Sequence, residues 1–114
     1  FEIRPEGEQL MEANSRRFGA PGIRSVIGDF TAQDLSSLPA PDAVFIGGHG
    51  GKMIEILQKI KEVLLPDGVI VFNSVSEESK ALFTKGITQI NKKVTQCTRI
   101  AVDAFNPIEI MRAE

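Results

Sequence analysis

The sequence predicts an α/β domain with a parallel sheet that ends in an antiparallel hairpin. An apolar run at residues 43–46 is followed by a glycine-rich turn, an amphipathic helical pattern over 53–65 and a second apolar run at 69–72. A strand, a turn and a helix in this order are typical of the crossover units of parallel sheets. Further on, residues 94–102 and 108–111 each alternate at least in part, and only a short connection separates them. Parallel strands need a long crossover, so we expect these two to pair antiparallel.

Length and composition indicate one globular domain. The chain has 114 residues, of which 42% are apolar and 25% charged, with a net charge of −2. Its basic residues are scattered and it has no Tyr or Trp, so we expect no nucleic-acid surface. Neither a membrane-spanning helix nor a secretory signal is visible in the sequence. Cys97 is the single cysteine, which excludes a multi-cysteine zinc site; we expect no metal and a cytoplasmic location.

In the first part of the chain we expect a strand end and a helix. Residues 1–4 have the pattern of a strand end, and Pro5 is favourable at a helix start. Residues 6–18 predict a helix that closes at Gly19, a typical C-cap. The helical spacing is carried by four positions, Leu10, Met11, Asn14 and Phe18.

A second junction of strand and turn follows this helix. Residues 23–27 are rich in β-formers and run into Gly28-Asp29-Phe30. Residues 34–38 are expected to form a short helix, which Pro39 stops.

The later helices are amphipathic. Over residues 53–65 the predicted apolar face consists of Met53, Ile56, Leu57, Ile60 and Leu64. The run at 69–72 is continuously apolar, which suits a central parallel strand covered on both faces. Ser76 is a typical N-cap before an acidic first turn, and Gly86 interrupts a helix whose buried stripe is Phe83, Ile87 and Ile90. The connection within the hairpin is expected at residues 103–107.

The segment most indicative of function is Gly47-Gly48-His49-Gly50-Gly51, which follows the strand at 43–46. Glycine allows positive φ and a close approach of the backbone to a ligand, so this turn is expected to border a crevice at the carboxyl end of the sheet. His49 is a candidate acid, base or hydrogen-bond donor to a substrate. The alternative is an ordinary loop histidine, exposed and mobile among its glycines.

Three other polar residues follow predicted strands. Glu2 is placed where α/β nucleotide-binding domains have a carboxylate that accepts from ribose hydroxyls, although a surface glutamate is an equal alternative. Asp29 could accept from an adenine amino group with Phe30 packed on the ring, or be an ordinary turn residue beside a core Phe. Asn73 could orient a polar ligand, cap the next helix or satisfy a turn.

These residues resemble a known family. The early segments Glu2-Ile3-Arg4-Pro5-Glu6, Glu12-Ala13-Asn14, Arg17-Phe18-Gly19 and Gly28-Asp29 are similar to the middle of class I S-adenosylmethionine-dependent methyltransferases. The resemblance is most specific to the decarboxylating precorrin methyltransferases of cobalamin biosynthesis. It is carried by Pro41 to Gly51, by Gly68 to Val75 with Glu78-Ser79, and by Asn106-Pro107-Ile108.

The resemblance implies a Rossmann-like methyltransferase sheet that uses S-adenosylmethionine. It implies that Glu2 holds the cofactor ribose and that Gly28, Asp29 and Phe30 surround its adenine, with Gly47 at the cofactor. Gly48, His49, Gly50 and Gly51 would face a precorrin tetrapyrrole, and we add Asn73 as a substrate contact. Methyl transfer to a ring carbon would accompany loss of carbon dioxide from an acetate side chain. Catalysis would rest on positioning and exclusion of water, so no residue is assigned a certain catalytic role, and His49 is a weak candidate.

One departure from the family pattern concerns the cofactor loop. In this family a glycine-rich loop follows the first strand, and the chain contains no Gly-x-Gly-x-Gly segment. We therefore expect residues 1–114 to be the C-terminal two-thirds of one methyltransferase domain, without the first strand and that loop, and to be inactive alone. An incomplete sheet leaves strand edges that favour association, so a homo-oligomer is expected.

Several alternatives stay open at this point. One is a methyltransferase acting on another small molecule or on RNA, although the Asn/Asp-Pro-Pro-aromatic motif common in nucleic-acid amino-methyltransferases is absent after residue 46. Others are a non-catalytic assembly domain of the same fold and an NAD-binding domain. The sequence does not distinguish a metal-free from a cobalt-bearing corrinoid substrate.

Overall fold

The computed structural model describes residues 1–102 and 104–114. It forms two compact units, Phe1–Ser37 and Leu38–Glu114, and each is described by itself.

The first unit is built around one helix and one isolated β-bridge. Helix α1 spans Gly7–Arg17, and Gly19 beyond its end has a φ of +71°, as its predicted capping role requires. The strands expected at 1–4 and 23–27 are reduced to a single parallel bridge between Glu2 and Ile27. Two backbone hydrogen bonds hold that bridge, Glu2 N to Val26 O at 3.0 Å and Gly28 N to Glu2 O at 2.9 Å. The ends of the two predicted strands therefore lie side by side.

The predicted helix is present, but two of the four positions that carry its helical spacing are exposed. Leu10 and Phe18 are 62% and 74% exposed, and the buried positions of the helix are Gly7 and Ser15. Ser15 is drawn inward because its hydroxyl donates to the carbonyl of Ala20 in the following turn. The region expected to form a helix at 34–38 is not helical. There the carboxylate of Asp34 accepts from the Ser36 N–H at 2.9 Å and makes a turn instead.

The only helical turn nearby is a 3₁₀ segment, η1, over Phe30–Ala32 in the described part of this unit. Asp29 caps it, since its Oδ1 accepts from the Thr31 N–H at 2.9 Å and from the Thr31 hydroxyl at 2.7 Å.

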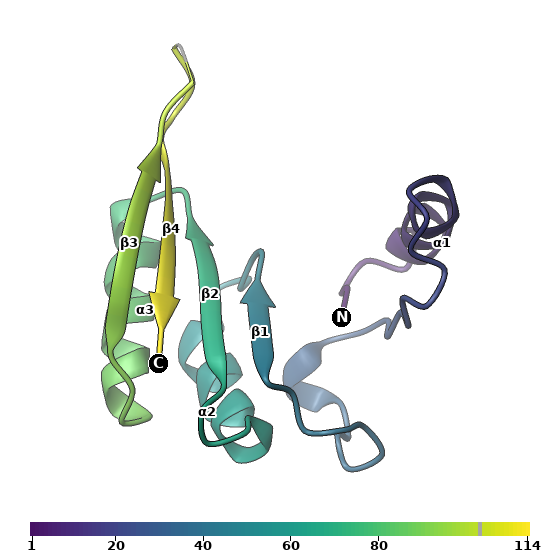
Figure 1. The fold of residues 1–114 in the computed structure, drawn as a ribbon, viewed down its shortest axis with the longest axis horizontal. Coiled ribbons are helices and arrows are strands. Elements are labelled where there is room, and N and C mark those ends of the chain that lie inside the picture. The colour runs from purple at the N-terminus through teal and green to yellow at the C-terminus, as the bar shows by residue number, and fades with distance from the viewer. Residues whose placement is uncertain (103) are drawn as a thin grey trace. The chain divides into compact units, whose positions relative to one another are not determined.

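The second unit contains a mixed four-stranded sheet in the order β1-β2-β4-β3 (Figure 1). The strands are β1 (Ala43–Ile46), β2 (Val69–Ser74), β3 (Val94–Ile100) and β4 (Ile108–Ala113). β1 and β2 are parallel, whereas β4 pairs antiparallel with both β2 and β3. The predicted fold class, with its C-terminal antiparallel hairpin, is confirmed. The expected hairpin connection includes residue 103, which lies outside the described residues.

Helices α2 (Met53–Val63) and α3 (Glu77–Gln89) lie on the same face of this sheet (Figure 1). They pack against the alternate positions of β2 that are buried, Ile70, Phe72 and Ser74. The predicted stripe of α3 is buried: Phe83, Ile87 and Ile90. Gly86 is explained by the same packing, because a Cβ there would lie 2.5 Å from Leu57 Cδ1 of α2. The two helices approach each other closely at this glycine.

β2 does not have two covered faces, contrary to the prediction. Its burial alternates along the strand, with Val69, Val71 and Asn73 only half-buried on the face away from α2 and α3. On that same face, Phe45 of β1 lies beside Val71 in the register and is 64% exposed. The prediction was wrong because helices cover only one face of β2 and an antiparallel strand, β4, is one of its neighbours. Only alternate residues are therefore buried, although the whole run is apolar.

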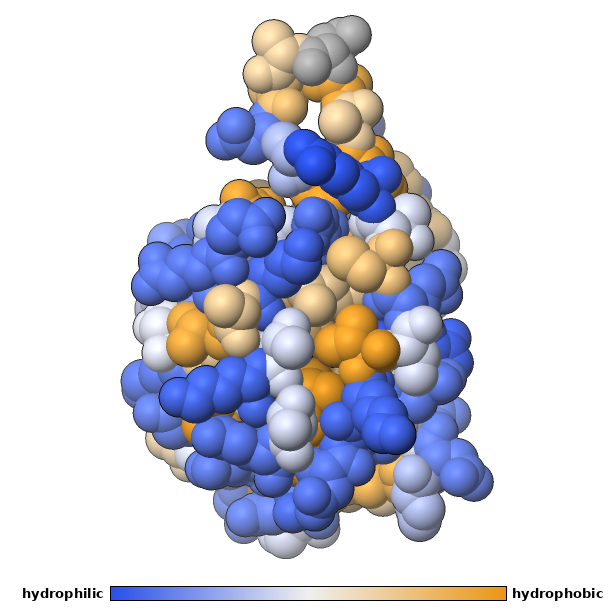
Figure 2. Space-filling view, turned by 90° about the vertical axis from the view of Figure 1, so that its left-hand side faces the viewer, coloured by the Kyte–Doolittle hydropathy of each residue, from blue (hydrophilic) through white to orange (hydrophobic). Residues whose placement is uncertain are grey.

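Figure 2 shows the connection between β3 and β4 standing out from the body of this unit, with apolar surface gathered towards its tip. The exposed apolar side chains that the structure describes there are Ile100, Val102, Phe105 and Ile108.

Candidate functional site

The glycine turn after β1 leaves its backbone uncovered. Gly50 and Gly51 have φ values of +53° and +83°, so the turn geometry itself favours glycine at both positions. Gly48 has no such requirement, and a Cβ placed on it would meet no atom within 4 Å. Neither conformation nor internal crowding explains the missing side chain of Gly48. Open space beside the backbone at this position is available to a ligand.

His49 is anchored within this turn. Its Nε2 lies 3.0 Å from the hydroxyl oxygen of Ser79, and its Nδ1 lies 3.1 Å from the backbone nitrogen of Gly51. Its ring also packs edge-on against buried Phe72, with the centroids 6.1 Å apart. The side chain is half-buried, so the alternative of an exposed loop histidine is wrong. Flanking glycines fold the ring back onto the sheet instead of freeing it.

The two hydrogen bonds of His49 define its tautomer. The Gly51 N–H can only donate, so Nδ1 must be the unprotonated acceptor. In a neutral imidazole the proton is then on Nε2, which donates to Ser79 Oγ. Both ring nitrogens are occupied by the protein, and neither is presented to a substrate in this arrangement. His49 therefore clasps the glycine turn to the start of α3.

The start of α3 extends this hydrogen-bonded chain. Ser76 is the N-cap, as predicted, because its Oγ accepts from the Ser79 N–H at 3.1 Å. The two serine hydroxyls also lie 3.0 Å apart. Ser74, at the end of β2, donates to the Ser76 carbonyl at 2.8 Å. The glycine turn, the helix start and the strand end are thus joined at the carboxyl edge of β1 and β2.

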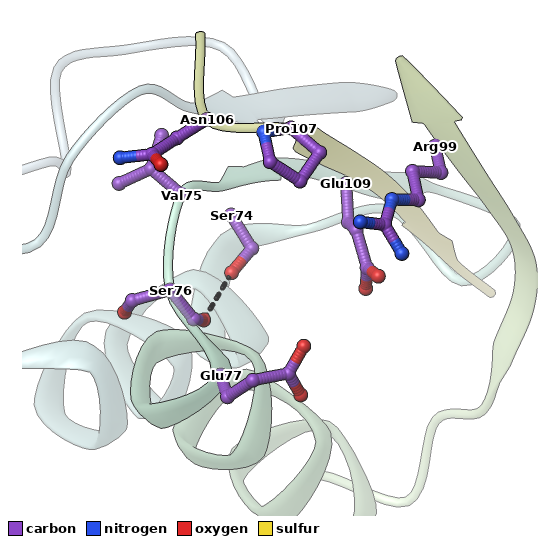
Figure 3. A pocket seen from close by; sticks show the side chains of 8 residues that line it. All are labelled: Ser74, Val75, Ser76, Glu77, Arg99, Asn106, Pro107 and Glu109. Atoms are coloured by element: carbon purple, nitrogen blue, oxygen red, sulfur yellow. Dashed lines mark hydrogen bonds between the residues drawn. The ribbon is translucent and has the colours of Figure 1, made fainter. Parts of the chain in front are cut away.

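A pocket of about 250 Å³ opens at this edge (Figure 3). It is lined by residues 74–77 of β2 and α3, by Arg99 of β3, and by Asn106, Pro107 and Glu109 at the start of β4. Ligand sites of α/β folds lie at this end of the strands. The hairpin, which was predicted only as a structural element, supplies one wall of the pocket.

The charged groups at this pocket are partly paired. Lys80 Nζ lies 2.5 Å from Glu109 Oε2, which ties α3 to β4. The hydrogen bond from Lys80 lowers the pKa of Glu109, and the same contact raises the pKa of Lys80. Cys97 Sγ also lies 3.7 Å from Glu109 Oε2. Arg99 and Glu77 reach the pocket from its opposite walls, with Glu109 beside Arg99 (Figure 3).

Asn73 is not brought to this pocket. Side chains alternate along β2, so Asn73 is on the face opposite to Phe72 and Ser74, whereas His49 contacts the Phe72 side. The two residues predicted to contact the same substrate therefore lie on different faces of the sheet.

In the first unit, Glu2 is engaged by a neighbouring arginine. Its Oε1 accepts from the Arg4 backbone N–H and Nε, each at 2.9 Å, and its Oε2 accepts from Arg4 Nη2 at 3.1 Å. The side-chain hydrogen bonds from Arg4, followed by the backbone one, lower the pKa of Glu2 to about 2. Gly7 makes room for this carboxylate, since a Cβ there would collide with Glu2 Cγ. Glu2 is thus a fixed anion.

The Gly28-Asp29-Phe30 turn adjoins Glu2 through the β-bridge. Gly28 has a φ of +126°, and a Cβ would lie 2.7 Å from Gln33 Nε2. The rings of Phe30 and Phe1 make an edge contact with their centroids 4.9 Å apart. The structure therefore brings Glu2, Asp29 and Phe30 into one local cluster, as expected of successive strand ends.

Comparison with protein families decides the class of this chain. The model described as "Precorrin methyltransferase domain" matches residues 1–113. The chain belongs to the precorrin methyltransferase domain family. Its matched region contains both the Glu2 cluster and the pocket of the second unit.

Known precorrin methyltransferases resemble the chain in sequence and structure. It is 37% identical over 82 residues to a Sinorhizobium protein named Precorrin-6Y C(5,15)-methyltransferase [decarboxylating], a match that covers 72% of this chain and 19% of that protein. It is 32% identical over 76 residues to a Methanothermobacter thermautotrophicus protein named Probable cobalt-precorrin-6B C(15)-methyltransferase (decarboxylating), covering 67% and 40%.

A solved Precorrin-6y C5,15-methyltransferase from Geobacter metallireducens matches the fold with a TM-score of 0.84 and 28% identity. The match covers 98% of this chain and 63% of that one. The chain therefore spans less than two-thirds of the length of each of these relatives. No helix in the described part of this precorrin methyltransferase domain is long and apolar enough to cross a membrane.

Three charged residues that line the pocket, Glu77, Arg99 and Glu109, were not among the predicted site residues. Nor was Ser79, the partner of His49, which entered only as part of a motif. The observed register pairs Arg99 with Glu109. Counting outwards from the connection predicted at residues 103–107 would instead place Arg99 opposite Met111, so the predicted hairpin did not indicate this pair.

Proposed function

We propose that this chain contributes to methyl transfer from S-adenosylmethionine to a ring carbon of a precorrin, coupled to loss of carbon dioxide from an acetate side chain, in cobalamin biosynthesis. Membership of the precorrin methyltransferase domain family over residues 1–113 is the observation that supports this most strongly. The names of the relatives support both the substrate class and the decarboxylation.

The residues of the first unit suit part of such a cofactor. A ribose needs acceptors for its hydroxyls and adenine an acceptor for its amine, and Glu2 and Asp29 supply carboxylates at adjacent strand ends. Bound S-adenosylmethionine would supply an electrophilic methyl group. Arg4 already holds Glu2, so a ribose would compete with that arginine for the carboxylate. The chain itself contains no Gly-x-Gly-x-Gly loop, which the family resemblance places after its first strand.

The residues of the second unit suit a large flat substrate. Gly48, Gly50 and Gly51 leave open space along the turn, so a macrocycle can approach the backbone without an intervening side chain. The His49–Ser79 hydrogen bond holds that wall in place against α3. Since His49 uses both ring nitrogens internally, we assign it a positioning role and give no residue an acid–base role. The chain's contribution is orientation and exclusion of water.

The test is an acceptor screen with labelled S-adenosylmethionine. It compares the 114-residue chain with a chimera in which the first strand and glycine loop of the Geobacter metallireducens protein precede Phe1. We expect the chimera to label a precorrin-6 substrate and not transfer RNA, and the chain alone to be inactive. Labelling of RNA in place of the precorrin would contradict the proposed substrate, and tight S-adenosylmethionine binding by the chain alone would contradict the need for the loop.

A further inference from the structure

We propose that Arg99 binds a carboxylate of the tetrapyrrole that the reaction retains, which makes it a specificity-determining residue. The inference rests on the function proposed above and adds a subsite to it.

The size of the pocket beside Arg99 suits one side chain of such a substrate. Pockets that enclose a drug-sized ligand usually measure about 300–1,000 Å³. At about 250 Å³ this pocket is too small for a tetrapyrrole ring, and it has room for an acetate or propionate arm. The chain Ser76–Ser79–His49 connects its wall to the open glycine turn. A ring lying along the turn could therefore extend one arm into the pocket.

Arg99 is the cation available to that arm. The other arginine of the hairpin, Arg112, is paired with Glu114, and Glu109 is paired with Lys80. Among the described residues Arg99 makes no ion pair of its own, although Glu109 lies next to it (Figure 3). Its planar guanidinium can donate two parallel hydrogen bonds to a carboxylate. Asn106 also lines the pocket, farther from Arg99 than Glu109 is (Figure 3).

The carboxylate bound here is one that stays on the product. Loss of carbon dioxide breaks the bond to the carboxyl carbon and leaves the electron pair on the substrate, which then takes a proton from water. A guanidinium paired with the departing carboxylate would stabilise its charge in the ground state and slow this step. Arg99 therefore fits an arm that orients the ring, and not the acetate that is lost.

Glu77 provides a second test, in which the expected change in binding affinity has the opposite sign. Its carboxylate lines the same pocket from the first turn of α3 and repels an entering anion. Removal of the Glu77 charge should strengthen binding of a polycarboxylate, whereas removal of the Arg99 charge should weaken it.

The experiment measures binding of uroporphyrin, an octacarboxylate tetrapyrrole, by fluorescence quenching. Four forms of the chain are compared: wild type, Arg99→Gln, Glu77→Gln and, as the matched control, Arg112→Gln. We expect Arg99→Gln to raise the Kd about five- to tenfold and Glu77→Gln to lower it about two- to threefold. Arg112→Gln should leave it unchanged. Circular dichroism spectra establish that each variant is folded.

The outcomes separate the two proposals. If the wild type binds and Arg99→Gln binds equally well, the Arg99 subsite is wrong and the proposed function stands. Equal weakening by Arg99→Gln and Arg112→Gln would also overturn the subsite, because it would indicate general attraction to positive charge. A folded wild-type chain that does not bind the porphyrin would count against the tetrapyrrole function itself.

Discussion

At the residue scale, His49 and Gly48 have different roles in the glycine turn. His49 fixes the turn to α3 through its ring nitrogens, and Gly48 contributes the absence of a side chain. The sequence pattern predicted this turn and made His49 a candidate site residue. It did not predict the tautomer, because the partner Ser79 lies thirty residues along the chain, on another element.

The clasp made by His49 predicts an energetic coupling to Ser79. Ser79→Ala should destabilise the chain by about 0.5–1.5 kcal/mol, the usual contribution of one such hydrogen bond. His49→Ala should cost more, because it also removes the acceptor of the Gly51 N–H and the ring contact with Phe72. The double variant should cost less than the sum, with a coupling of about 0.5–1 kcal/mol. Urea unfolding of the four forms measures this. Strictly additive effects would show that the side chains do not interact in solution.

Gly48 yields a prediction that separates binding from stability. Gly48→Ala adds a methyl group where no atom lies within 4 Å and where φ is not positive. Its free energy of unfolding should change by no more than about 0.5 kcal/mol, while uroporphyrin binding should weaken severalfold. Gly22→Ala is the matched control, because Gly22 also has open space around it but lies in the first unit. Unchanged binding by Gly48→Ala would remove the turn from the substrate site.

Glu2 and Arg4 predict a pH dependence with a definite sign. The folded pKa of Glu2 is about 2, below the ordinary value of 4.5, so its ionised form stabilises the fold above pH 4.5. That stabilisation is lost as the pH falls from 4.5 towards 2. In the Arg4→Gln variant the pKa of Glu2 should rise towards 4.5, measured by NMR titration of its carboxyl carbon. Arg16→Gln, which removes a partner of Glu12, should leave Glu2 unchanged; a normal Glu2 pKa in the wild type would contradict the pairing.

At the element scale, amphipathic patterns predicted α2, α3 and the strands of the second unit well. Burial of Met53, Leu57 and Ile60 follows directly from their spacing. Helical spacing also predicted α1 correctly, yet its Leu10 and Phe18 are exposed. Periodicity indicates which residues share a helix face, and it does not say whether the surrounding chain covers that face.

Gly86 shows how a residue that weakens a pattern can be required by packing. In Gly86→Ala the new methyl group would lie 2.5 Å from Leu57 Cδ1 and 3.1 Å from Ile54 Cδ1. Leu57 is fully buried, so it has little room to move. We expect a loss of about 1–2 kcal/mol, since overpacking outweighs the helix propensity that alanine gains. Chemical denaturation checks this, and a more stable variant would mean that α2 and α3 are not in close contact there.

At the scale of the whole molecule, the sequence predicted the sheet class, the hairpin and the family. It did not predict the pocket, because Ser76, Arg99 and Asn106 come from three separate segments. Their juxtaposition depends on β4 pairing between β2 and β3, an order that local patterns do not encode. The residues expected at the cofactor and at the substrate remain predictions for experiment.

The most direct test identifies the product made by the chimera that carries the family's first strand and glycine loop before Phe1. The chimera is supplied with S-adenosylmethionine and a precorrin-6 substrate. Mass spectrometry should find a corrinoid that has gained a methyl group and lost the mass of carbon dioxide. The Gly48→Ala chimera should make less of the same product. An unaltered precorrin, in the presence of a folded chimera that binds S-adenosylmethionine, would contradict the proposed function.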